Sequence, residues 1–181
     1  MKEALLVMDM QTRIVGMIAE PSVLLANARK AIDAAHAKKI PVIYVVITFR
    51  EGFPEVSLNN KSFSAIKQNQ AAFADPSQTS VHTDLGSQQG DILVTKRRVS
   101  AFTGSDLEVI LRSLGIERMV LTGIATSGVV LSTLREAADK DYQLTVLSDG
   151  CADMDPEVHR VLLEKVFPRQ ADVMSVEQWA K

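Results

Sequence analysis

The stretch from Arg118 to Leu147 reads RMVLTGIATSGVVLSTLREAADKDYQLTVL, and its hydrophobic pattern decides the fold. Residues 118–124 are a short apolar run typical of a buried strand. Residues 129–140 carry apolar side chains at helical spacing, and residues 143–147 form a second strand-like run. A strand, a helix and a strand in this order predict a β-α-β unit with parallel strands.

The same alternation continues on both sides of this unit. Further strands are expected at residues 4–8, 41–48, 91–95 and 172–174, and further helices at residues 21–39, 105–114 and 156–166. Repeated β-α units predict an α/β protein with three αβα layers: a Rossmann-like, doubly wound, mostly parallel sheet of about six strands. A length of 181 residues suits one domain, residues 1–181, and is short for two.

The segment from Phe49 to Gly90 interrupts the alternation. It loses hydrophobic periodicity and is rich in Ser, Asn, Gln and Pro, apart from a short helix that the pattern favours at Ser62–Phe73. A long irregular segment inside a compact domain is typical of a functional element, so we predict an insertion or a lid and not a linker.

Charge and cysteine content exclude several functions. A formal net charge of −2 gives no positive field for nucleic acid. The apolar run Ala4–Met8 is too short for a signal sequence or a membrane span. A single cysteine, Cys151, cannot close an intramolecular disulfide. We expect a cytoplasmic protein that acts on a small molecule and binds neither nucleic acid nor membranes.

Polar residues at strand ends are the candidate site, because ligands bind beyond the carboxyl ends of parallel strands. Asp9 follows Leu5–Met8, and its apolar neighbours would raise its pKa toward that of a general acid or base. Lys96 ends the strand at residues 91–95, and Arg97 or Arg98 could assist it. The alternatives are that Asp9 caps the next helix and that Lys96 is simply solvated.

The segment Gly123–Ala137 leads from a strand into a helix through small residues. Such a turn lets backbone amides at a helix N-terminus approach an oxyanion or carboxylate. A tight turn selected only for packing explains the same spacing.

Three features in order give a family resemblance: Asp9 with Gln11, Lys96 with the run Ser100–Phe102, and the turn in Gly123–Ala137. The sequence resembles the isochorismatase-like, or cysteine hydrolase, superfamily over nearly its whole length. The resemblance implies a hydrolase in which Asp9 and Lys96 are catalytic. It also implies a homo-oligomer, for which residues 49–73 could supply an interface.

The sequence departs from the family pattern at the position of the nucleophile. Amidases of the superfamily carry a cysteine after G-x-x-T-x-x, which is Val129 here, so thioester chemistry at that position is excluded. The resemblance still places oxyanion-binding amides at Gly128 and Val129, and a non-proline cis peptide that could involve Ala125. Ser127 and Phe102 complete the expected substrate contacts of this region.

No metal or cofactor is expected. Nicotinamidase-like relatives bind zinc through Asp-x-His-x-His after the second strand, where this chain has Thr48–Gly52. The three histidines, His36, His82 and His159, are too far apart in sequence for a compact ligand set.

These observations leave three hypotheses for the function. In the first, Asp9 protonates the enol carbon of a small carboxylated substrate, as in isochorismatases, while Lys96 holds Asp9 or the substrate and Arg50 or Arg97 pairs with anionic groups. In the second, the protein binds a small molecule without catalysis. In the third, Ser127 or Thr126 is the nucleophile of an amidase, although the sequence reveals no histidine base beside them.

Cys151 could be a displaced nucleophile, since it follows the strand at residues 144–147. A buried structural cysteine is the more common explanation for a single thiol at such a position.

Overall fold

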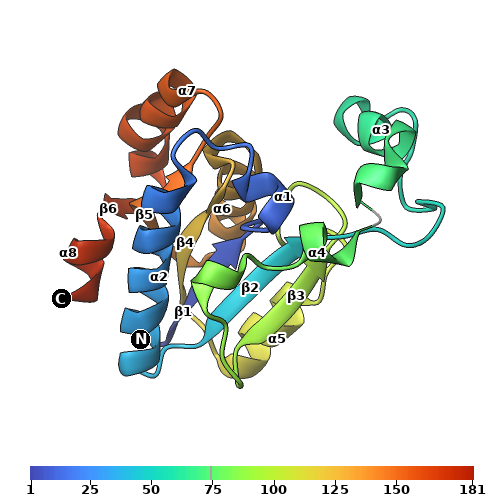
Figure 1. The fold of residues 1–181 in the computed structure, drawn as a ribbon. Coiled ribbons are helices and arrows are strands. Elements are labelled where there is room, and N and C mark those ends of the chain that lie inside the picture. The colour runs from blue at the N-terminus through green and yellow to red at the C-terminus, as the bar shows by residue number, and fades with distance from the viewer. Residues whose placement is uncertain (74) are drawn as a thin grey trace.

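The protein, described by a computed structural model over residues 1–73 and 75–181, is built around one six-stranded sheet (Figure 1). All neighbouring strands run parallel, in the order β3-β2-β1-β4-β5-β6. The strands are β1 (Glu3–Met8), β2 (Val42–Ile47), β3 (Ile92–Lys96), β4 (Arg118–Ile124), β5 (Gln143–Ala152) and β6 (Asp172–Met174). The predicted doubly wound parallel sheet is confirmed.

Helices cover both faces of the sheet and complete three layers. Helices α2 and α8 pack on one face, and α5 and α6 pack on the other (Figure 1). The α-helices are α1 (Thr12–Val15), α2 (Pro21–Ala37), α3 (Lys61–Gln68), α4 (Pro76–Thr79), α5 (Leu107–Leu114), α6 (Leu131–Asp139), α7 (Pro156–Val161) and α8 (Val176–Ala180). Shorter helical turns cover Gln70–Phe73, Thr83–Leu85, Thr126–Val130, Leu162–Val166 and Phe167–Arg169.

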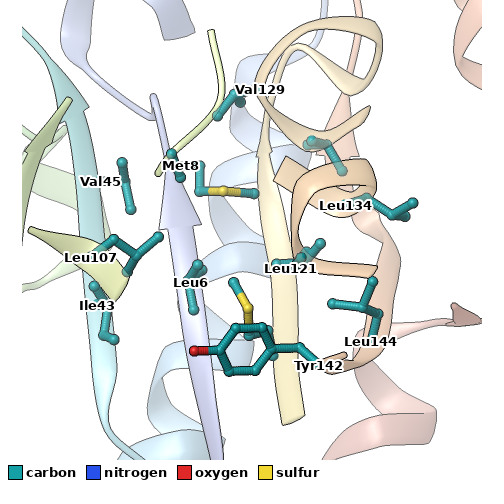
Figure 2. Close-up of a cluster of buried hydrophobic side chains, with 14 of the residues drawn as sticks. Leu6, Met8, Ile43, Val45, Leu107, Leu121, Val129, Leu134, Tyr142 and Leu144 are labelled. Atoms are coloured by element: carbon teal, nitrogen blue, oxygen red, sulfur yellow. The ribbon is translucent and has the colours of Figure 1, made fainter. Parts of the chain in front are cut away.

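Strand β1 is buried on both faces, which explains its continuous apolar sequence. Leu6 and Met8 pack toward α5 and α6 (Figure 2), whereas Leu5 and Val7 pack toward α2. Adjacent strand residues point to opposite faces, so a central parallel strand has no polar side to display. Its carboxyl end therefore delivers the next residue, Asp9, to the rim of the sheet.

Two elements differ from their predicted form. The expected helix at residues 129–140 begins with the irregular turn Thr126–Val130, and regular helix starts only at Leu131. Strand β5 is longer than the expected 143–147 and extends to Ala152, so Cys151 lies within it. The pairing register of β4 and β5 shifts between Leu121 and Gly123, and a sequence pattern does not encode such an irregularity.

Residues 49–73 form an arm that projects from the body of the protein (Figure 1). The predicted short helix is confirmed as α3 and the turn after it. Phe53, Val56 and Phe63 build a small core of their own against Ile47 at the end of β2. Within the residues that the structure describes, no helix combines the length and apolar character needed to cross a bilayer.

Candidate active site

The site is built on Asp9 and Lys96, which come from two strands separated by β2. Asp9 directly follows β1, and its backbone turns sharply there with φ of 56°. Lys96 is the last residue of β3, and its Nζ lies 2.9 Å from Asp9 Oδ2. The two residues are 7% and 1% exposed. Asp9 is therefore one half of a buried ion pair and not a helix cap, since Gln11 occupies the N-cap position of α1.

Lys96 is fixed by three hydrogen bonds. Its ammonium donates to Asp9 and also to the carbonyl oxygens of Arg98 and Val99, at 2.9 and 3.0 Å. An ammonium group has three donors, so this geometry satisfies all of them. Of the two roles expected for Lys96, the arrangement suits holding Asp9 and leaves no donor for a substrate carboxylate.

Burial and charge act on the carboxyl of Asp9 in opposite directions. Burial raises the pKa of Asp9 to about 6, although the neighbouring Lys96 charge and its hydrogen bond lower it. Burial also lowers the pKa of Lys96, against the opposing effect of Asp9. A carboxyl that titrates near neutral pH in an enclosed site can act as a general acid.

Gln11 fastens the segment after Asp9 to the neighbouring strand. Its Oε1 accepts from Ile47 N at 2.9 Å, and its Nε2 donates to Ile47 O at 3.1 Å and to Thr79 O at 2.5 Å. The side-chain amide thus continues the hydrogen bonding of the sheet beyond the end of β2. The sequence singled out Gln11 only as part of a motif, because its partners are distant in the chain.

The turn Thr126–Val130 follows β4 beside this pair. The peptide bond Ile124–Ala125 is cis, which confirms the expectation for Ala125. Gly128 has non-helical dihedral angles, and its amide donates to Ala125 O at 3.0 Å, so this predicted oxyanion donor is engaged within the turn. The Val129 side chain is 1% exposed and belongs to the core cluster that includes Met8 (Figure 2).

A histidine lies at this turn, which the sequence did not reveal. His159, from α7, places Nδ1 2.8 Å from the hydroxyl of Thr126. The amide of Ser127 donates to Asp153 Oδ2 at 2.7 Å, which ties the same turn to the loop before α7. Burial lowers the pKa of His159, against the opposing charge of Asp153. No spacing signal marks His159, because only tertiary packing brings α7 to the turn.

The expected arginines converge on one carboxylate. Arg50 and Arg97 lie 3.4 and 3.5 Å from Glu55 Oε1, and Arg97 also donates to the carbonyl and hydroxyl oxygens of Thr48. Arg98 donates to the carbonyl of Glu55 at 2.5 Å. Two guanidinium groups therefore share the Glu55 carboxylate, and a third binds the backbone of the same residue, so the cluster carries a net positive charge.

The side chain of Phe102 lies in the hydrophobic core and not at the Asp9–Lys96 pair. Its ring packs in the core against Tyr142, with 6.3 Å between ring centroids, and the Lys140 ammonium lies 5.4 Å from it. Tyr142 lies directly before the start of β5, whereas Asp9 and Lys96 lie at the carboxyl ends of β1 and β3. Because all strands are parallel, Tyr142 is at the opposite edge of the sheet. The side chain of Phe102 therefore contributes packing in this structure.

Cys151 is buried in β5, and its Sγ lies 3.8 Å from Leu121 O. Burial raises the pKa of its thiol to about 12, so it is not a thiolate nucleophile at neutral pH. The histidines are dispersed: His36 pairs with Asp91, His82 caps a turn and His159 meets Thr126. Over residues 1–73 and 75–181, no group of three potential metal ligands is found.

Residues 3–178 match the isochorismatase domain family. The chain belongs to the isochorismatase family. It is 31% identical over 180 residues to the uncharacterized isochorismatase family protein YwoC of Bacillus subtilis, covering 98% of this chain and 92% of the relative. It is also 31% identical to the ureidoacrylate amidohydrolase RutB of Agrobacterium fabrum, over 86% of this chain and 69% of the relative.

A solved isochorismatase family protein from Burkholderia thailandensis superposes with a TM-score of 0.84 at 30% identity, covering 97% of this chain and 92% of that one. Membership of the isochorismatase family, with amidohydrolases among the relatives, identifies the protein as a hydrolase. This isochorismatase-family hydrolase has only one cysteine, and that residue is buried.

Proposed function

We propose that the protein hydrolyses a small carboxylated molecule by acid catalysis from Asp9, without a cysteine nucleophile. One observation carries the proposal. Lys96 holds Asp9 Oδ2, whereas Asp9 Oδ1 is buried and has no hydrogen-bond partner among the residues that the structure describes. A buried polar atom without a partner is costly and calls for a ligand. The proton of neutral Asp9 belongs on Oδ1, facing whatever fills this position.

A vinyl ether is the substrate class that uses such a proton. Asp9 transfers the proton from Oδ1 to the terminal alkene carbon, and the ether oxygen shares its lone pair to form an oxocarbenium ion. A water molecule adds to the cationic carbon and returns one proton to Asp9. The resulting hemiketal splits into a ketone and an alcohol, so one water is consumed. Lys96 stabilises the carboxylate that exists between the two proton transfers.

Charge around the site favours an anionic substrate. Arg50 and Arg97 share the single carboxylate of Glu55, so they are not fully neutralised. Arginine binds carboxylates through two parallel donors, and partial burial of Arg97 strengthens that interaction. A substrate carboxylate would complete this cluster.

A second candidate is an amidase that uses Thr126, and the contact between Thr126 and His159 favours it. A neutral imidazole 2.8 Å from a hydroxyl is the arrangement of a nucleophile and its general base. The fully buried side chain of Thr126 counts against attack on a substrate unless the turn opens. The proposal for Asp9 therefore ranks first.

The test is turnover of isochorismate, ureidoacrylate, nicotinamide and simple amides by four proteins: wild type, Asp9→Asn, Thr126→Ala and Asp33→Asn. Asp33 is an exposed partner of Arg29 and provides a matched control for an Asp-to-Asn change. We expect pyruvate release from isochorismate by wild type, Thr126→Ala and the control, and its loss in Asp9→Asn. Amide hydrolysis that disappears with Thr126→Ala would favour the amidase. Binding without turnover in all four proteins would favour a non-catalytic binding protein.

A further inference from the structure

The two backbone carbonyls that hold Lys96 belong to the loop after β3, residues 97–106. Arg98 and Val99 supply these carbonyls, and each accepts one of the three ammonium donors. The position of the ammonium beside Asp9 therefore depends on where this loop is anchored. Backbone carbonyls on a loose loop would not define a position to a fraction of an ångström.

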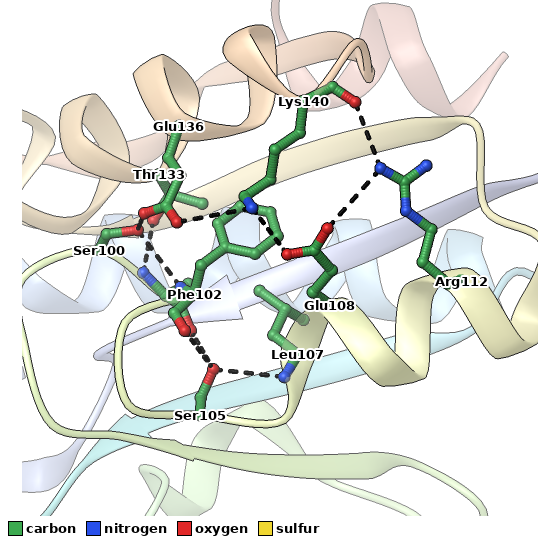
Figure 3. A network of polar contacts seen from close by, with 10 residues as sticks. Ser100, Phe102, Ser105, Leu107, Glu108, Arg112, Thr133, Glu136 and Lys140 are labelled. Atoms are coloured by element: carbon green, nitrogen blue, oxygen red, sulfur yellow. Dashed lines mark hydrogen bonds and ion pairs between the residues drawn. The ribbon is translucent and has the colours of Figure 1, made fainter.

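The anchor lies one residue further on, at Ser100. Its hydroxyl donates to Glu136 Oε2 of α6 at 2.6 Å, and the amide of Ala101 donates to the Thr133 hydroxyl of the same helix at 2.9 Å (Figure 3). A short hydrogen bond to an ionised carboxylate is among the stronger neutral-to-charged contacts in proteins. Helix α6 also continues directly from the turn Thr126–Val130, so one helix fixes both the turn and the Lys96 loop.

We propose that Glu136 and Ser100 are positioning residues that hold the Arg98 and Val99 carbonyls, and through them the Lys96 ammonium, against Asp9. This proposal rests on the proposed function in one respect: the position of Lys96 matters for activity because Asp9 supplies the catalytic proton. The contact path runs from Glu136 to Ser100, through one peptide unit to Val99, and from there to Lys96.

The remainder of the loop is held by its own hydrogen bonds, so we expect a displacement at Ser100 to reach Val99. Ser105 Oγ donates to Ala101 O at 2.6 Å and accepts from Leu107 N at 3.2 Å (Figure 3). Arg97 N donates to Thr103 O at 3.2 Å, which closes the loop on itself. Ser100 is buried, whereas the side chain of Glu136 is one-third exposed.

Charged groups surround Glu136 on its outer side. Lys140 Nζ lies 4.0 Å from Glu136 Oε1 and 2.7 Å from Glu108, which in turn lies 3.7 Å from Arg112 (Figure 3). On the inner side, the charge that acts on Asp9 is that of Lys96. Glu136 therefore influences Asp9 through the position of the loop and not through direct charge.

Loss of the anchor lets the ammonium of Lys96 move away from Asp9. An opposite charge in contact lowers a carboxyl pKa by about 1–3 units, so a loosened contact gives back part of that effect. For Glu136→Ala and Ser100→Ala we expect the pKa of Asp9 to rise by about 0.5–1 unit. Glu136→Gln retains an acceptor for the Ser100 hydroxyl, so the wild-type pKa should persist.

The experiment is a carbon-detected NMR titration of the Asp9 carboxyl in wild type and these variants, with the signal assigned by its absence in Asp9→Asn. Glu108→Ala is the control, since Glu108 belongs to the same network but does not touch Ser100. A rise in Glu136→Ala and Ser100→Ala, with Glu136→Gln and Glu108→Ala unchanged, supports the proposal. An unchanged pKa in Glu136→Ala overturns it, even if the variant is less stable. The readout needs no substrate, so failure here is distinct from failure of the vinyl-ether mechanism.

Discussion

At the scale of single residues, Asp9 combines a buried position with a cationic neighbour. Burial disfavours its charged form, and Lys96 favours it, and burial has the larger effect. The sequence predicted that the pKa of Asp9 is raised, because an aspartate directly after a wholly apolar strand lies among apolar neighbours at the strand end. It could not predict that the other two donors of Lys96 bind the backbone carbonyls of Arg98 and Val99, because those contacts depend on the conformation of a loop.

The first prediction concerns pH. Turnover that uses the Asp9 proton should be nearly constant below the pKa of about 6 and should fall about tenfold per pH unit above it. For stability, a folded-state pKa above the ordinary value of 3.8 means that the native state binds this proton more tightly. The corresponding stabilisation is present at low pH and is lost as the pH rises through 6. A rate profile that rises between pH 6 and 8 would contradict an acid role for Asp9.

The second prediction concerns the buried pair. Lys96→Met should leave the buried Asp9 without its partner and raise the pKa of Asp9 above 6. It should destabilise the protein at pH 8 by about 3–5 kcal/mol, because the carboxyl must then be buried unpaired or take up a proton. Asp9→Asn combined with Lys96→Met removes both charges and should recover most of that loss. Urea unfolding of the two single variants and the double variant at pH 8 measures the coupling. Losses that simply add would show that the pair is not coupled.

At the scale of elements, the close approach of β4 to β1 sets the place where Asp9 leaves the sheet. A Cβ on Gly123 would lie 2.6 Å from the carbonyl oxygen of Met8, the residue before Asp9. Periodicity identified both strands, but it carries no information on which glycine is required by contact with a neighbouring backbone. The helix boundary at Leu131 was missed for a related reason, because the preceding turn has irregular dihedral angles.

The third prediction follows from this contact. Gly123→Ala should destabilise the protein by about 1–3 kcal/mol through overpacking, and should lower turnover because Met8 and Asp9 must shift. Gly16→Ala is the matched control, since its nearest atoms would be 3.5 Å away and its backbone is helical. Its stability should stay within about 0.5 kcal/mol of wild type. Thermal unfolding and activity of both variants make the comparison, and equal stabilities would refute the role given to Gly123.

At the scale of the whole molecule, alternating strand and helix patterns were sufficient to predict the layers and the parallel sheet, because each β-α unit has one favoured handedness. They were not sufficient to bring His159 to Thr126, or Glu136 to Ser100, since those contacts join elements far apart in the chain. The hydrophobic pattern also did not predict the small core of the projecting arm. The segment Phe49–Gly90 was predicted as an insertion or lid, and the phenylalanines in its first part, residues 49–73, form a separate small core.

The order of strands in the sheet has a consequence for synthesis on the ribosome. Strand β1 is made before every other strand, yet it lies in the middle of the finished sheet between β2 and β4. Its partner β4 is translated only after β2, β3 and their connections. The apolar segment Ala4–Met8 therefore lacks one of its two neighbouring strands through most of translation. An unpaired apolar strand edge promotes aggregation and is a target for chaperones. Asp9, the acid of the proposed mechanism, therefore reaches its final place only when this late partner docks.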